Sequence, residues 1–123
     1  MDWQFMVEDN QNKGEEVSLN VEWYHLVACF FAGIFLANAV PHYVNGISGD
    51  AFPTPFANPP GVGLSPPVVN VLWALFNIAS GYVLIRVGKL SVKDKWTVAV
   101  FFAGVVLISL VLSIHFTGKA SGA

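Results

Sequence analysis

Three long apolar stretches constrain the fold of this chain more than any other feature. Residues 23–44, 67–88 and 96–117 together contain one charged side chain, Arg86. A helix rises by about 1.5 Å per residue, so each stretch is long enough to cross a hydrocarbon core of about 30 Å. The pattern predicts an all-α membrane protein, a three-helix transmembrane bundle in direct contact with the lipid bilayer.

The composition excludes several other classes of protein. Only 11% of the 123 residues are charged, whereas a soluble domain carries about 25%. The net charge of −2, with no basic stripe, argues against binding to nucleic acid. One cysteine, Cys29, cannot support a disulfide framework. We therefore expect an integral membrane protein.

The first apolar stretch does not resemble a signal peptide. A signal peptide has a basic start and an apolar core of 7–15 residues, but the first 22 residues here contain six acidic residues and one lysine. We therefore expect three helices, at about 21–45, 66–88 and 92–117, within a transmembrane domain of residues 23–118. An acidic tail of residues 1–22 precedes this domain and a short tail of residues 119–123 follows it.

Capping residues mark these expected helices. The first helix is expected to begin at Asn20 and to stop at Asn45-Gly46, because these residue types favour helix ends. Ser65-Pro66 is expected to open the second helix and Gly88 to close it. The third is expected to have a capping box over residues 91–94 and to stop at Gly118.

Cationic residues predict the orientation in the membrane. The short segment between the second and third helices contains or borders four of the six cationic residues: Arg86, Lys89, Lys93 and Lys95. By the positive-inside rule this segment is cytoplasmic. We therefore expect a cytoplasmic N-terminus and a C-terminus on the outer side, in the periplasm or the exterior.

The loop of residues 46–65 is then expected on the outer side of the membrane. Six of the seven prolines lie within residues 53–67, and proline density of this kind excludes a helix. Phe52 and Phe56 are expected to anchor the loop across the mouth of the bundle. The sequence therefore predicts a folded, proline-rich outer loop.

Polar side chains inside a membrane are costly and raise the question of a functional site. Counting helix rise places His42, Asn70 and His115 in one layer outward of the midplane, and Asn38 and Asn77 deeper. Two interpretations remain open for the five candidate ligand-binding residues. They line an outward-facing polar pocket, or they form hydrogen bonds between helices. Ser109 and Ser113 share another face of the third helix, about 200° away from His115.

Histidine chemistry offers two less favoured alternatives. His42 and His115 could be axial ligands of a haem, or could bind Zn²⁺ or Cu²⁺ together with Asp50. The chain has no nucleophile elbow, no HExxH motif and no helical carboxylate pair, so no catalytic residue and no cofactor are predicted.

The segment from Asn38 to Asn77 resembles a set of small bacterial inner-membrane proteins without an assigned activity. The resemblance rests on Asn-Ala-Val-Pro-His, Phe-Pro-Thr-Pro-Phe and Pro-Pro-Gly-Val-Gly, and covers about a third of the chain. It implies a bacterial membrane setting and no site residue.

The leading functional hypothesis is a non-enzymatic accessory protein that packs into a larger membrane assembly or a homo-oligomer. The second is a protein that binds a lipid or small molecule in the outward-facing polar pocket. The third is a haem- or metal-binding redox component that uses His42 and His115.

Overall fold

The computed structural model describes residue 4 and residues 21–118, and the expected tails lie largely outside these residues. The N-cap expected at Asn20 is wrong, because Glu22 is the N-cap of the first helix. It contains three long helices, which are α2 (Trp23–Ile47), α3 (Pro67–Val87) and α4 (Lys95–His115). Two short strands, β1 (Phe52–Pro53) and β2 (Leu64–Ser65), lie between α2 and α3. Each helix is long and apolar enough to cross a membrane, which confirms the expected all-helical fold.

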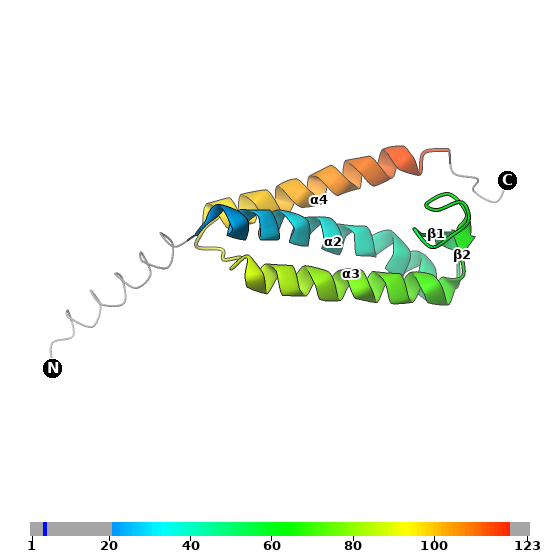
Figure 1. Ribbon diagram of the computed structural model, residues 1–123, viewed down its shortest axis with the longest axis horizontal. Helices are drawn as coiled ribbons and strands as arrows, with labels where there is room; N and C mark the ends of the chain where they lie inside the picture. Colours follow the sequence, from blue (N-terminus) through cyan, green and yellow to red (C-terminus); the bar gives the residue numbers. More distant parts are fainter. Residues whose placement is uncertain (1–3, 5–20, 119–123) are drawn as a thin grey trace.

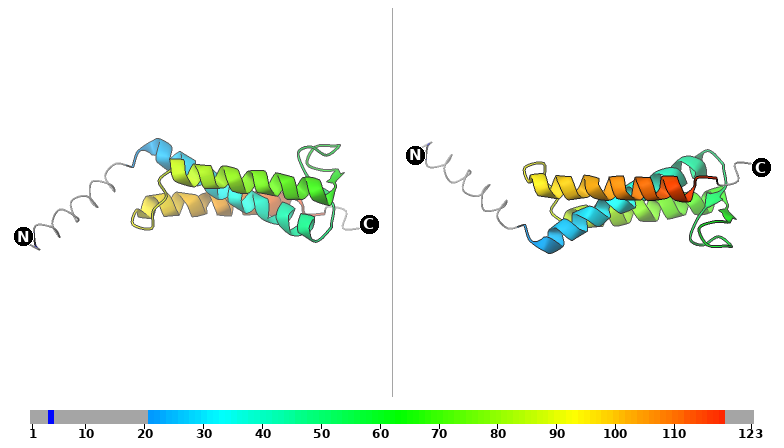
Figure 2. Two further views of the ribbon diagram at one scale, coloured as in Figure 1. Left: turned by 90° about the horizontal axis from the view of Figure 1, so that it is seen from below. Right: turned by 90° about the horizontal axis from the view of Figure 1, so that it is seen from above.

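The helices are arranged with α2 in the middle. Helices α3 and α4 both pack against α2 and barely contact one another. In Figure 1 the three helices lie side by side in the order α4, α2, α3, and the two views of Figure 2 show this layer from its edges. Both broad faces of the layer consequently expose apolar side chains, as expected for helices surrounded by lipid.

Small residues allow α2 to approach both neighbours. A Cβ at Gly33 would overlap the carbonyl oxygen of Phe101 in α4, and a Cβ at Gly104 would overlap the carbonyl oxygen of Phe30 in α2. On the other side, a Cβ at Gly81 would lie 2.6 Å from the side chain of Leu36. Close backbone approach through small residues is typical of helix packing in membranes.

Helices α2 and α4 are not equally close along their length. In Figure 1 they lie close together at the end near the segment of residues 88–94 and separate toward the end that carries β1 and β2. Only Thr97 and Gly104 are buried in α4, whereas eight residues are buried in α2. The α2–α4 pair is therefore open on the side of the strands.

The helix ends differ from several expected caps. The expected stop at Asn45-Gly46 is wrong, because α2 continues to Ile47. Gly46 lies inside the helix, where a Cβ would come within 2.9 Å of the Pro67 carbonyl oxygen. Gly46 allows α2 to pack closely against α3 and does not end the helix.

Two further caps are also corrected. Pro66 and not Ser65 is the N-cap of α3, because Ser65 belongs to β2 and its hydroxyl pairs with that of Thr54. Asp94 and not Ser91 caps α4, since its carboxylate accepts from the backbone N–H of Trp96 at 3.0 Å. Gly88 closes α3, as expected. The expected stop at Gly118 is wrong, because α4 ends at His115 with Phe116 as its C-cap.

The crossing of α2 and α4 yields a stability prediction. Replacement Gly104→Ala should destabilise the protein by about 1–3 kcal/mol, the usual cost of overpacking, because the new methyl group meets backbone and cannot be accommodated by a side-chain rotation. The measurement is thermal unfolding in mild detergent. Ala103→Leu, at an exposed neighbouring position, is the control and should leave the melting temperature nearly unchanged. Equal effects of the two substitutions would contradict the crossing.

Candidate functional site

The segment between α2 and α3, residues 48–66, forms a folded cap over one end of the helices. Strands β1 and β2 pair antiparallel, with Phe52 opposite Ser65. The hydroxyl oxygens of Thr54 and Ser65 lie 2.6 Å apart. The Thr54 carbonyl oxygen accepts from the backbone N–H of Gly61 at 2.9 Å, which closes the wider turn. The proline-rich segment thus has internal hydrogen bonds instead of helical ones.

Asn70 attaches this cap to α3. Its side chain is fully buried, and its Nδ2 donates to the carbonyl oxygens of Phe52 at 3.0 Å, Ser65 at 3.1 Å and Pro66 at 3.2 Å. Because all three partners are acceptors, the amide nitrogen must point at them and Oδ1 must point the other way. One side chain therefore joins both strands to the first turn of α3.

The orientation of Asn70 determines the tautomer of His42. Asn70 Oδ1 lies 2.8 Å from Nδ1 of His42, and because Oδ1 can only accept, Nδ1 of the neutral imidazole must carry the hydrogen. The ring is buried and packs edge-on against Phe52, with ring centroids 5.3 Å apart. Nε2 of the neutral ring then carries a lone pair, and it has no hydrogen-bond partner among the described residues.

The deeper pair of asparagines also meets. Asn38 Nδ2 donates to Asn77 Oδ1 at 3.1 Å, and Asn77 Nδ2 donates to the Trp73 carbonyl oxygen at 2.7 Å. Both contacts lie between or within α2 and α3. Asn77 therefore binds α2 through Oδ1 and the backbone of its own helix through Nδ2.

His115 lies at the other side of the cap. Its Nε2 donates to the Gly61 carbonyl oxygen at 2.8 Å, so it ties the end of α4 to the cap. A cavity of about 150 Å³ separates His115 from His42. Its walls come from all three helices and from the cap: Asn38, His42, Pro53, Thr54, Pro55, Gly61, Trp73, Leu112, His115 and Phe116.

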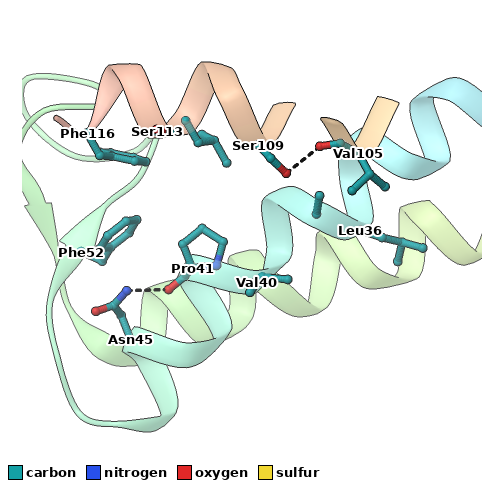
Figure 3. A pocket seen from close by; sticks show the side chains of 11 residues that line it. Leu36, Val40, Pro41, Asn45, Phe52, Val105, Ser109, Ser113 and Phe116 are labelled. Carbon is teal, nitrogen blue, oxygen red and sulfur yellow. Dashed lines mark hydrogen bonds between the residues drawn. The ribbon is translucent and has the colours of Figure 1, made fainter. Parts of the chain in front are cut away.

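A larger hollow, here called the groove, lies between α2 and α4. It has a volume of about 670 Å³ and is open on one side. The lining residues are Leu36, Ala37, Val40, Pro41, Asn45, Phe52, Val105, Ser109, Leu112, Ser113 and Phe116. Figure 3 shows α4 above and α2 below the groove, with Phe52 and Phe116 facing one another at the cap.

The polar groups of the groove are few and uncharged. Ser109 Oγ donates to the Val105 carbonyl oxygen at 2.6 Å, and Asn45 Nδ2 donates to the Pro41 carbonyl oxygen at 2.7 Å, as the dashed lines in Figure 3 mark. Both side chains therefore satisfy the backbone of their own helix. The remaining wall is largely apolar, so the groove suits a hydrocarbon guest.

The expected metal ligands are not grouped. Among the described residues no set of three or more His, Cys, Asp or Glu side chains is placed to hold a metal ion. Asp50 is exposed and does not line the cavity that His42 and His115 share.

The two expected loop anchors differ in burial. Phe52 is buried in the cap, but Phe56 is 67% exposed. Among the described residues, the one aromatic ring that contacts Phe56 is Trp73, in an edge-to-face arrangement with ring centroids 5.1 Å apart.

The groove was not part of the expected site. The spacing of Ser109 and Ser113 signals a shared helix face, and these two serines do line one hollow. The signal from Ala37 and Pro41 is weaker, since neither residue type is unusual in a membrane helix. Trp73 is the other residue without a sequence signal, and its indole Nε1–H is buried without a partner among the described residues.

Comparisons with known proteins return no match: no family model, no curated protein and no solved structure is significantly similar to this chain.

The attachment of the cap yields a prediction. Replacement Asn70→Leu keeps the side-chain size but leaves three carbonyl groups and His42 without their partner, which should cost about 1–3 kcal/mol. The cap should then be cleaved markedly faster by a protease added to the purified protein. Asn45→Leu, which removes one hydrogen bond within α2, is the matched control. Cleavage of the cap at equal rates in both variants would contradict the role of Asn70.

Proposed function

We propose that this protein is a non-enzymatic membrane protein that binds the hydrocarbon tail of a lipid in the groove between α2 and α4. The observation that carries the proposal is the groove itself, the largest of the hollows described here, with apolar walls and no charged lining residue. Its volume of about 670 Å³ lies within the range of about 300–1,000 Å³ that is usual for ligand sites.

The length of the groove favours a lipid tail over a partner helix. On α4 the groove runs from Val105 to Phe116, which is about 16 Å at the rise of an α-helix. That is about half of a hydrocarbon core of about 30 Å. A tail from one leaflet has this reach, whereas a helix that crosses the membrane would find a groove along only half of its length.

Both ends of the groove support the same conclusion. The backbones of α2 and α4 meet at Gly33 and Gly104, one turn or less below the groove lining. At the cap, the rings of Phe52 and Phe116 face one another with centroids 4.8 Å apart. A ligand must therefore enter through the open side of the groove, and in a bilayer this side faces lipid.

The polar residues near the cap support binding rather than catalysis. Asn70 bonds to His42 and to carbonyl groups of the cap, and Asn77 bonds to Asn38 and to the Trp73 carbonyl group. The hydroxyl of Thr54 pairs with that of Ser65. Interhelical hydrogen bonds of this kind are ordinary in membrane proteins. This proposal therefore replaces the outward-facing polar pocket with an apolar groove beside a polar clamp. The polar clamp is the set of hydrogen bonds that Asn70 forms with His42 and with the carbonyl groups of the cap.

The membrane setting completes the proposal. We place the three helices across a bacterial inner membrane, with the Lys- and Arg-rich segment between α3 and α4 in the cytoplasm and the cap on the periplasmic side. The groove then opens to the outer leaflet. Assembly with other membrane subunits or with a second copy is the competing function, and the exposed face of α4 is where such a partner would pack.

Photo-crosslinking tests the groove. A phospholipid with a diazirine near the middle of its acyl chain, incorporated into nanodiscs with the full chain, should label peptides from the outer halves of α2 and α4. Ala37→Phe fills the groove and should reduce this labelling at least several-fold. Ala79→Phe, at an exposed position on α3, is the matched control and should not reduce it. Uniform labelling of all three helices, unchanged by Ala37→Phe, would overturn the proposal.

Fusions test the orientation. Alkaline phosphatase fused after residue 123 should be active in a bacterial host, because the enzyme folds only on the periplasmic side, and a fusion at Lys93 should be inactive. The opposite pattern would place the cap and the groove on the cytoplasmic side and would contradict the outer-leaflet assignment.

A further inference from the structure

The groove and the small cavity under the cap are neighbours. Leu112 and Phe116, near the end of α4, line both hollows, so the groove and the cavity share one edge. The groove is apolar, and the residues that line the cavity include His42, His115 and Asn38. An apolar groove that adjoins a cavity with a few polar groups has the shape of a site for an amphiphile.

His42, which lines the cavity, has an acceptor atom whose tautomer is fixed. Nδ1 of His42 is committed as a donor to Asn70, whose own orientation is fixed by three carbonyl groups. Nε2 of the neutral ring is therefore an acceptor without a partner among the described residues. Trp73 lines the same cavity, and its indole N–H is a buried donor without a partner among those residues.

The charge of the cavity selects the kind of head group. No Asp, Glu, Lys or Arg side chain lines it, and an uncompensated ion is costly in a buried, largely apolar site. A neutral hydroxyl group can donate to His42 Nε2 and accept from an indole N–H. The volume of about 150 Å³ suits a small head group.

We infer that the groove and the cavity together bind a neutral lipid with a small hydroxyl head, such as a long-chain alcohol or a monoacylglycerol. The tail lies in the groove between α2 and α4, and the hydroxyl donates a hydrogen bond to Nε2 of His42. This inference rests on the proposed function, because it specifies the head group of the lipid whose tail the groove holds.

Competition against the photoreactive phospholipid tests the inference with two probes of equal tail length, oleyl alcohol and oleyl methyl ether. The ether can accept a hydrogen bond but cannot donate one. The full chain in nanodiscs should bind the alcohol about two- to tenfold more tightly, the equivalent of one net hydrogen bond. Glycerol alone should not compete, since it lacks the tail. Displacement of the photoprobe by glycerol would overturn the two-part site.

His42→Asn is the informative variant. The asparagine amide retains a donor near the position of Nδ1, so the contact with Asn70 survives, but it has no counterpart of Nε2. The variant should bind both probes with the affinity that the wild type has for the ether. His25→Asn, at the opposite end of α2, is the matched control and should retain the preference for the alcohol.

A measurement on the unmodified protein covers the case in which His42→Asn does not fold. The ¹⁵N resonance of His42 Nε2 should shift when oleyl alcohol is added and should not shift with the ether. Equal affinities for the two probes with groove labelling intact would overturn the hydroxyl assignment and leave the tail site standing. Absence of groove labelling would overturn the tail site itself.

Discussion

Direct backbone contact between α2 and α4 at Gly33 and Gly104 is the constraint on which the rest of the structure depends. Two helices whose backbones meet at these glycines and cross at an angle separate away from this contact. Because α2 packs along its other side against α3, the separation on the cap side cannot be closed by a sideways shift of α2. The groove is therefore a geometric consequence of where the glycines lie.

The cap is a non-helical segment that covers the end of the helices at which α2 and α4 separate. Its prolines remove backbone donors, so fewer N–H groups have to be satisfied near the membrane surface. Asn70 donates hydrogen bonds to three of the carbonyl groups of the cap. One of them belongs to Phe52, so this bond holds Phe52 where its ring contacts that of Phe116. The polar clamp and the apolar groove are two parts of one arrangement, since the clamp positions the residue that closes the groove.

Some of this arrangement could be predicted from the sequence. Three helices follow from three uncharged stretches, because length and hydropathy are local properties. Counting helix rise placed His42 and Asn70 at one depth, and these two side chains do meet. The expected helix ends at Gly46 and Ser65 were wrong because Gly46 serves packing against α3 and Ser65 belongs to a strand, and both roles depend on contacts distant in the sequence. The cap expected at Ser91 was wrong because Asp94, three residues later, accepts from the first N–H groups of α4.

The groove could not be predicted for the same reason. Its walls come from residues more than 60 positions apart, and its opening depends on the crossing geometry of α2 and α4, which no single helix encodes. The spacing of Ser109 and Ser113 predicts that they share one face of α4, but it does not predict which residues of α2 lie opposite that face. Fold class was therefore within reach of the sequence, whereas the shape that suggests a function was not.

The distribution of free hydrogen-bonding capacity argues for selective binding beside the cap. Around the cap, most polar side chains form hydrogen bonds to one another or to the backbone, which is the expected state of buried polar groups. Among the described residues, His42 Nε2 and the indole N–H of Trp73 depart from this state, and both residues line the cavity. The hydrogen bond to Asn70 sets the tautomer of His42. A fixed tautomer in a rigid clamp presents its lone pair without the entropy cost of ordering a mobile side chain on binding. Specificity for a donor head group would then come from the same hydrogen bonds that hold the cap on the bundle.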